Sequence, residues 1–174
     1  ILIEGSKGDN DFEQEQFRGD IQEMARLLTT HPVNSGQGYT GQYLRDHIFY
    51  VGVHDDISEL DLFRKIPENN DLIEPNNNDP DDETGKNAIF EAIFKVASLC
   101  DSYDSVIFFY TSHGKYRGAE YDSRTYLFDA NDNHNPYSEV GDLSPTELNN
   151  ALNKINCLKL FIILIQEDLI FGSI

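Results

Sequence analysis

The amino-acid sequence predicts an α/β fold: a three-layer sandwich in which helices cover both faces of a mainly parallel, doubly wound sheet. Apolar runs typical of strands alternate along the chain with segments of helical periodicity, in the order β-α-β-α-β-α-β. The strand segments are also continuously apolar, which is typical of strands covered on both faces. We expect a single domain over residues 1–174, because this length is sufficient for one hydrophobic core.

Apolar runs mark the expected strands. The four parallel strands are, in chain order, Ile1–Gly5, Ile48–Val53, Val106–Thr111 and Leu158–Ile165, and Tyr126–Phe128 is a candidate short strand or hairpin. Strands 1 and 3 of a doubly wound sheet commonly flank the topological switch point. We therefore expect the ends of these two strands to open into one crevice, and strand 4 to end beside strand 3.

The expected first helix has one apolar face, formed by Phe17, Ile21, Met24 and Leu28. Residues 5–16 before it form a polar segment, which predicts a loop. A second helix is expected to begin near Thr84, where a threonine can cap it, and to continue through a wide apolar face.

The third helix has the clearest local signal in the chain. Ser144 is in the N-cap position, Pro145 in the first helical position, and Glu147 completes a capping box. We expect this helix to run to about Asn153 and to be followed by a short turn and the fourth strand.

The excess of acidic over basic residues disfavours some classes of binding partner. The chain has 13 basic and 31 acidic residues, a formal net charge of −18, which disfavours binding to nucleic acids or anionic membranes. Part of this charge lies in the acidic, Asn- and Asp-rich segment Pro67–Glu83, a predicted surface loop. The longest apolar run, Leu160–Ile165, is too short to span a bilayer, so we expect no membrane insertion.

No cofactor or metal is predicted. Asp129–Asn133 has oxygen-bearing residues at the spacing that opens a calcium loop, but His134 and Val140 occupy the positions where an EF-hand needs Gly and Glu. A solvated turn is the alternative there. The two cysteines, Cys100 and Cys157, allow either one disulfide or two free thiols, and they do not indicate a compartment.

His113 and Gly114 are the candidate catalytic residues, because they directly follow the third strand. A histidine there can act as a general acid or base near neutral pH, and the backbone N–H of Gly114 can contribute to an oxyanion hole. Arg18, which follows the first strand and its loop, is the candidate substrate-binding residue. The alternatives are an ordinary polar turn at residues 112–114 and a surface ion pair from Arg18 to Asp20 or Glu23.

Five short motifs follow one another along the chain: Gly5-Ser6-Lys7-Gly8, Phe17-Arg18, Asp55-Asp56-Ile57, Thr84-Gly85 and Thr111-Ser112-His113-Gly114. As an ordered set, they resemble the legumain branch of the caspase–hemoglobinase cysteine peptidases. The resemblance covers nearly the whole chain. It implies a caspase-like sheet and an endopeptidase that cleaves peptide or protein substrates after Asn or Asp.

The resemblance also implies residue roles. A cysteine thiolate after strand 4 would attack the peptide carbonyl, His113 would protonate the leaving amine, and Gly114 would help to hold the oxyanion. Arg18 would lie in the pocket for the residue before the scissile bond, where a guanidinium favours Asp or Asn side chains. Lys7 departs from the pattern, because legumain members have Asn at that place.

The larger departure is the nucleophile. The resemblance places a cysteine after strand 4, at Glu167 when counted along the strand or at Leu169 when counted back from Gly172-Ser173. Cys157, at the start of strand 4, is some 26 Å from that edge at about 3.3 Å per residue.

Two accounts follow. The chain is a peptidase domain whose last residues are truncated or misread, incomplete at its C-terminus and lacking the sheet's last strands. Alternatively, it is a non-catalytic pseudopeptidase that serves as an interaction or regulatory module. A nucleotide or phosphate binder is a third alternative, but residues 5–8 lack the glycine spacing of the known phosphate loops.

Overall fold

The computed structural model describes residues 1–5, 11–30, 47–52, 64–65, 84–116, 125–127 and 143–168. The predicted loop Pro67–Glu83, the candidate calcium loop Asp129–Asn133, and Lys7 and Leu169 lie outside the described residues. Within this part of the chain the elements follow one another in the predicted α/β order.

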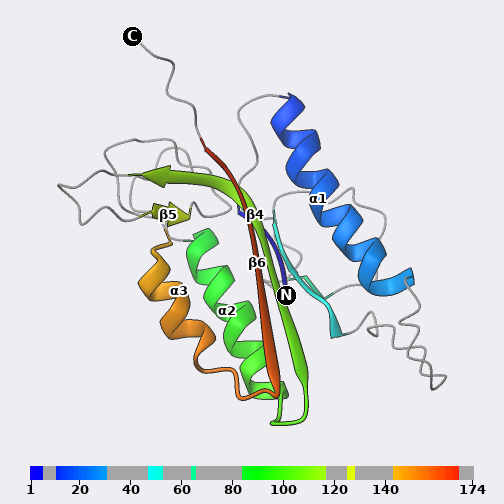
Figure 1. The fold of residues 1–174 in the computed structure, drawn as a ribbon, viewed down its shortest axis with the longest axis vertical. Helices are drawn as coiled ribbons and strands as arrows, with labels where there is room; N and C mark the ends of the chain where they lie inside the picture. Colours follow the sequence, from blue (N-terminus) through cyan, green and yellow to red (C-terminus); the bar gives the residue numbers. More distant parts are fainter. Residues whose placement is uncertain are drawn as a thin grey trace.

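The centre of the fold is one six-stranded sheet (Figure 1). Its strands are β1 (Leu2–Glu4), β2 (Phe49–Val51), β3 (Arg64–Lys65), β4 (Ser105–Tyr116), β5 (Thr125–Leu127) and β6 (Lys159–Asp168). The order is β3-β2-β1-β4, with β6 on β4, and all of these pairs are parallel. Of the described strands, β5 alone pairs antiparallel, with the last residues of β4. The expected neighbours β1 and β4 are confirmed, and the strand order reverses between them.

Helices cover the sheet from two sides (Figure 1). The helix α1 (Asp11–Thr30) lies on one face, and α2 (Thr84–Leu99) and α3 (Pro145–Leu152) lie on the other. The three layers of the sandwich are therefore confirmed. The predicted apolar face of α1 is also confirmed, because Phe17 and Ile21 are fully buried and Met24 and Leu28 pack against the core.

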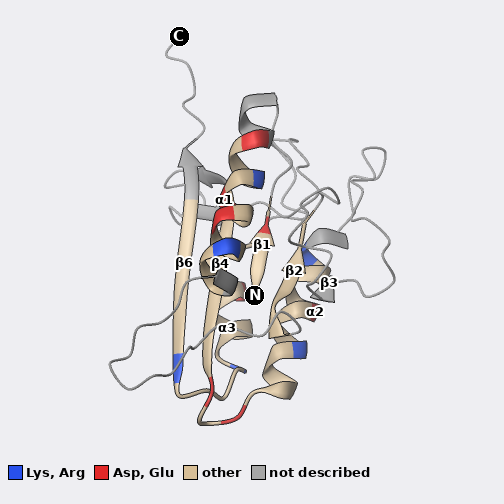
Figure 2. Cartoon of the chain, turned by 90° about the vertical axis from the view of Figure 1, so that its right-hand side faces the viewer, with Lys and Arg blue, Asp and Glu red and all other residues tan. Residues whose placement is uncertain are grey.

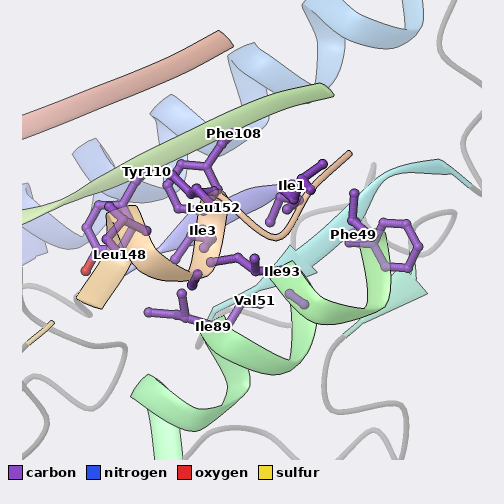
Figure 3. Close-up of a cluster of buried hydrophobic side chains, with 14 of the residues drawn as sticks. Ile1, Ile3, Phe49, Val51, Ile89, Ile93, Phe108, Tyr110, Leu148 and Leu152 are labelled. Carbon is purple, nitrogen blue, oxygen red and sulfur yellow. The ribbon is translucent and has the colours of Figure 1, made fainter. Parts of the chain in front are cut away.

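The core is divided by the sheet into two clusters. The larger one packs side chains of α2 and α3, including Ile89, Ile93 and Leu152, against Ile3 and Phe108 of the sheet (Figure 3). The smaller one packs α1 against the other face and contains the buried side chains Leu2, Ile21, Ala25, Ile48, Tyr50 and Phe109. Successive residues of β1 enter different clusters, as the period of two in a strand requires.

Several elements differ from the prediction, and β6 is among them because it continues to Asp168 instead of ending at Ile165. The helix α1 begins at Asp11 instead of near Phe17, because the polar segment before Phe17 is rich in helix-forming Glu and Gln with acidic residues at the N-terminus. The strand β4 continues to Tyr116 instead of ending at Thr111, since β5 and β6 provide partners for its last residues. The two-residue strand β3 has no apolar pattern and was not predicted.

Candidate functional site

The candidate site lies where β1, β4 and β6 end, which we call the carboxyl edge. β4 and β6 run in parallel register over ten residue pairs, and the last two pairs are His113 with Glu167 and Gly114 with Asp168. The expectation that the fourth predicted strand ends beside His113 is therefore confirmed. The interpretation of residues 112–114 as a turn is wrong, because all three belong to β4.

Gly114 is paired on both sides. It is the register partner of Leu127 in β5 and of Asp168 in β6. One residue cannot pair with two strands along the same edge, so β5 and β6 lie along opposite edges of β4. The backbone around His113 and Gly114 is thus held within the sheet.

Gly5, which directly follows β1, lies at the carboxyl edge in a position where a larger side chain would be crowded. The Gly5 N–H donates a hydrogen bond to the carbonyl oxygen of Thr111 at 2.8 Å. A Cβ atom at Gly5 would clash with the Tyr110 hydroxyl group and lie 2.9 Å from the Ser112 Cβ, so a larger residue fits only if these side chains of β4 shift. The glycine that begins the Gly-Ser-x-Gly motif therefore has a packing role.

Two carboxylates approach the carboxyl edge from the α1 side. Glu4 is fully buried and accepts a hydrogen bond of 2.6 Å from the Tyr50 hydroxyl. Asp20 of α1 accepts one of 2.7 Å from Thr111 Oγ1, and Thr111 is also the register partner of Glu4. These contacts tie α1, β2 and β4 together just before His113.

Neither Glu4 nor Asp20 was predicted to have this role. A signal for Glu4 was present, since an acidic residue at the end of an apolar strand needs a polar partner when it is buried. Asp20 had been considered only as a partner for Arg18, and the pairing with Thr111 depends on how α1 lies across the sheet.

Arg18 is placed on α1, partly exposed, two residues before Asp20. The helix that carries it therefore contacts β4 two residues before His113, at Thr111. Asp20 accepts a hydrogen bond from Thr111, and Glu23 forms an exposed ion pair of 2.6 Å with Arg26, but neither contact leaves Arg18 without a partner.

Both cysteines lie at the opposite end of the sheet. Cys100 directly follows α2 and Cys157 lies two residues before β6, and both pack against the larger core cluster as free thiols. Burial raises the pKa of the Cys100 thiol, and the charges of Asp104 and Cys157 raise it further. Cys100 is therefore a poor source of thiolate at neutral pH.

A cavity of about 500 Å³ also lies at this opposite end. Its lining includes Ile48, Ser105 and Cys100, which are at the beginnings of strands or the end of α2. It contains none of the predicted site residues.

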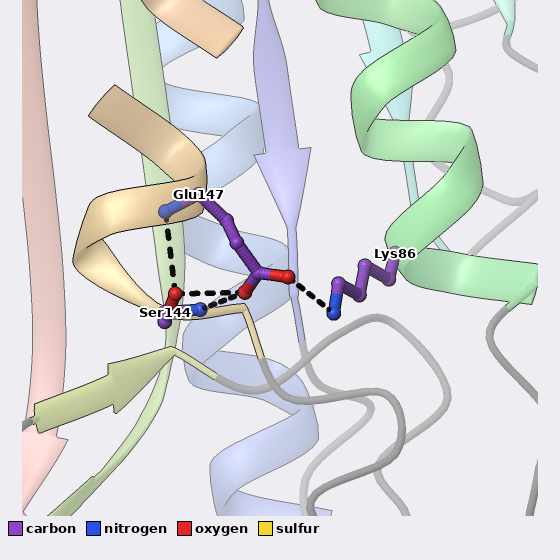
Figure 4. A network of polar contacts seen from close by, with 3 residues as sticks. All are labelled: Lys86, Ser144 and Glu147. Atoms are coloured by element: carbon purple, nitrogen blue, oxygen red, sulfur yellow. Dashed lines mark hydrogen bonds and ion pairs between the residues drawn. The ribbon is translucent and has the colours of Figure 1, made fainter. Parts of the chain in front are cut away.

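A polar network joins the beginnings of α2 and α3 (Figure 4). Ser144 and Glu147 form the predicted capping box, and Lys86 of α2 contacts the second Glu147 oxygen at 2.8 Å. Burial alone would raise the pKa of Glu147, but hydrogen bonds from Lys86 and Ser144 outweigh it and hold the pKa below its usual range. The network serves helix capping and helix–helix packing.

The described residues contain neither a cluster of metal ligands nor a membrane-spanning helix. No group of three or more His, Cys, Asp and Glu side chains there could hold a metal ion. No helix in the same part of the chain is long and apolar enough to cross a membrane.

The protein is an α/β protein with a mainly parallel sheet. At the carboxyl edge, His113 and Gly114 of β4 are the register partners of Glu167 and Asp168 of β6. Comparisons with known proteins add no family to this description. No protein-family model matches the chain, and no curated protein and no solved structure is detectably similar to it.

The chemistry available at the carboxyl edge follows from these placements. An imidazole can transfer protons there, and backbone N–H groups can stabilise an anion. The sequence positions opposite His113 and Gly114 are Glu167 and Asp168, and the chain's two cysteines are at the other end. A carboxylate is a far weaker nucleophile than a thiolate toward an amide.

Proposed function

We propose that this chain is a legumain-like cysteine-type endopeptidase domain, directed to Asn or Asp, in which the catalytic cysteine is missing. The observation that carries the proposal is the pairing of His113 with Glu167 and of Gly114 with Asp168. In a histidine–cysteine dyad the two side chains must be close together, so the strands that carry them must end side by side. The parallel pairing of β4 and β6 meets this requirement.

Each residue has a proposed role in the reaction. His113 protonates the leaving amine, and the Gly114 N–H stabilises the oxyanion. Arg18 binds the side chain of the Asn or Asp before the scissile bond, because a guanidinium can donate two hydrogen bonds to a carboxylate or amide. The contact between Asp20 and Thr111 supports this role, since it anchors the helix of Arg18 next to the strand of His113.

A second candidate function is a non-catalytic pseudopeptidase that binds polypeptide and acts as an interaction or regulatory module. The specific observation in its favour is the separation of the thiols from the carboxyl edge. Cys157 lies two residues before β6, whereas Glu167 is near its end, and the eight residues from Lys159 to Glu167 alone correspond to about 26 Å. The two candidates share the binding site and differ in hydrolysis.

The test restores the thiol. Glu167→Cys and Leu169→Cys variants are assayed with Asn- and Asp-containing reporter peptides, beside the unaltered chain. We expect no cleavage by the unaltered chain and cleavage by one of the variants, because a thiolate there would attack the carbonyl carbon and form a thioester while His113 protonates the departing amine. Water then releases the acid and regenerates the thiol.

Controls separate this reaction from nonspecific thiol chemistry. Ile165→Cys adds a thiol to the same strand, two residues further from the edge, and is expected to be inactive. His113→Ala in the active variant should remove cleavage. If both thiol variants fold, as judged by circular dichroism, and neither cleaves, the endopeptidase proposal is wrong and the pseudopeptidase remains.

A further inference from the structure

The two cysteines lie in segments that the fold brings together at the end of the sheet opposite the carboxyl edge. Cys100 directly follows α2, and Cys157 lies two residues before β6. Both are free thiols of intermediate burial, and both pack against the larger core cluster. Figure 2 shows acidic residues on the loop between α2 and β4, at the same end of the sheet as the beginning of β6.

Backbone hydrogen bonds join the two segments. The Leu158 N–H, one residue after Cys157, donates to the carbonyl oxygen of Asp104 at 2.7 Å. The Asp104 N–H donates to the carbonyl oxygen of Asp101 at 3.1 Å, and the Asp104 carboxylate accepts from the Asp101 N–H at 2.9 Å. These bonds close a tight turn directly after Cys100. Two backbone contacts therefore connect the neighbour of one cysteine with the neighbour of the other.

The two thiols also interact electrostatically. Burial is the largest cause of the raised pKa of Cys100, and the negative charges of Asp104 and Cys157 follow. Since the interaction of two charges weakens with distance, the effect of Cys157 on Cys100 agrees with the short backbone connection between them. Thiol–disulfide exchange needs one thiolate at a time, so this repulsion does not prevent it.

We propose that Cys100 and Cys157 form a reversible disulfide when the chain meets a low-molecular-weight disulfide such as oxidised glutathione. One protein thiolate attacks a sulfur of the oxidant, releases a glutathione thiolate and forms a mixed disulfide. The second protein thiolate attacks the protein sulfur of this mixed disulfide and releases the other glutathione. Two protein thiols are oxidised, their protons pass to the two glutathione thiolates, and one glutathione disulfide is reduced.

The bond fastens the end of α2 to the beginning of β6. Among the described strands β6 pairs with β4 alone, so a covalent link at its beginning adds a second attachment. A link between segments that are far apart in the sequence also restricts the unfolded chain, which stabilises the fold. Neither cysteine lies at the carboxyl edge, so the bond forms whether or not the proposed function is correct.

The test treats the folded, reduced chain with oxidised glutathione at about pH 8.5, near the ordinary pKa of a thiol. Mass spectrometry should show the loss of two hydrogen atoms and of both alkylatable thiols, and a digest should contain the Cys100 and Cys157 peptides linked to each other. The oxidised chain should unfold about 5 °C above the reduced chain, and dithiothreitol should reverse every change. Because a disulfide needs Cα atoms within about 7 Å, its formation in the folded chain measures this proximity.

Cys100→Ser and Cys157→Ser are the matched controls, since each removes one of the two sulfurs. Each folded variant should stop at the mixed disulfide with glutathione and gain no thermal stability from the bond within the chain. An unaltered chain that stays reduced, or that stops at mixed disulfides on both cysteines, overturns the proposal. A bond that links two copies, that forms only in denaturant, or that leaves the folded chain no more stable also overturns it.

Discussion

β4 and β6 are neighbouring parallel strands of similar apolar composition, yet their environments are opposite. From Phe108 to Tyr110 the side chains of β4 are almost completely buried, whereas the paired residues of β6, from Ile162 to Leu164, are exposed. β4 has β1 on one edge, β6 on the other, and helices over both faces. Among the described residues β6 has only β4 as a paired strand, so burial is set by the neighbours of a strand and not by its own sequence.

This difference also divides the candidate site. The β4 part, with His113, is held by the strands on either side and by the contact from Asp20 to Thr111. The β6 part, where the nucleophile would be, pairs with β4 alone among the described strands. We therefore expect the histidine to be positioned more firmly than anything placed at position 167.

The largest expected difference is in core stability. Phe108 and Ile162 are register partners, but Phe108 is fully buried and Ile162 is about half exposed. Phe108→Ala should lower the free energy of unfolding by about 3–5 kcal/mol, and Ile162→Ala by no more than about 1.5 kcal/mol. Chemical denaturation of both variants, at a concentration where the chain is monomeric, gives the comparison. Equal losses would mean that β6 is covered.

The next largest effect on stability is expected from the hydrogen bond between Tyr50 and the buried carboxylate of Glu4. Tyr50→Phe removes the hydroxyl that donates to Glu4 and should destabilise the fold by about 1–3 kcal/mol, because a buried acceptor loses a hydrogen bond. Tyr103 is 85% exposed, so Tyr103→Phe is the matched control and should change the unfolding free energy very little. Similar effects from the two substitutions would contradict a structural role for the Glu4 contact.

A smaller effect is expected at α3, which contributes to the layer over the face of β4. Ser144→Ala removes the N-cap acceptor and should lower the unfolding free energy by about 1 kcal/mol. Ser98 lies on the exposed face of α2, and Ser98→Ala should be neutral within about 0.5 kcal/mol. Thermal denaturation of the pair measures the difference, and no loss at Ser144 would argue against the capping box.

The smallest effect is a dependence on pH. The pKa of Glu147 lies below its ordinary value of 4.5, so its ionised form stabilises the fold above that value and the contribution is lost as the pH falls through the lowered pKa. The stability difference between the unaltered chain and Glu147→Gln should therefore shrink on acidification below pH 4.5. A difference that grows on acidification would show that the sign is wrong.

The sequence predicted the fold well because its signals are local. Apolar runs identified the longer strands, and the Ser144 capping box fixed the beginning of α3. The same reasoning could not detect β3, which has no apolar pattern, and it placed the end of β4 too early, because that end depends on pairing with β5.

The candidate site was predicted only in part. Strand order was sufficient to bring position 113 next to position 167. The contacts of Glu4 and Asp20 could not be predicted, since they depend on the angle and depth at which α1 and β2 meet the end of β4. The exposure of β6 was also missed, because a continuously apolar run predicts a buried strand.

The location of the binding site is the claim on which the proposed function depends most, and peptide titration followed by nuclear magnetic resonance tests it directly. An Asn-containing peptide is added to the isotope-labelled chain, and the amide shifts are followed. We predict changes at His113, Gly114 and Arg18 and none at Cys100 or Cys157. Changes confined to the end of the sheet with the cysteines, or no change at the carboxyl edge, would contradict the account.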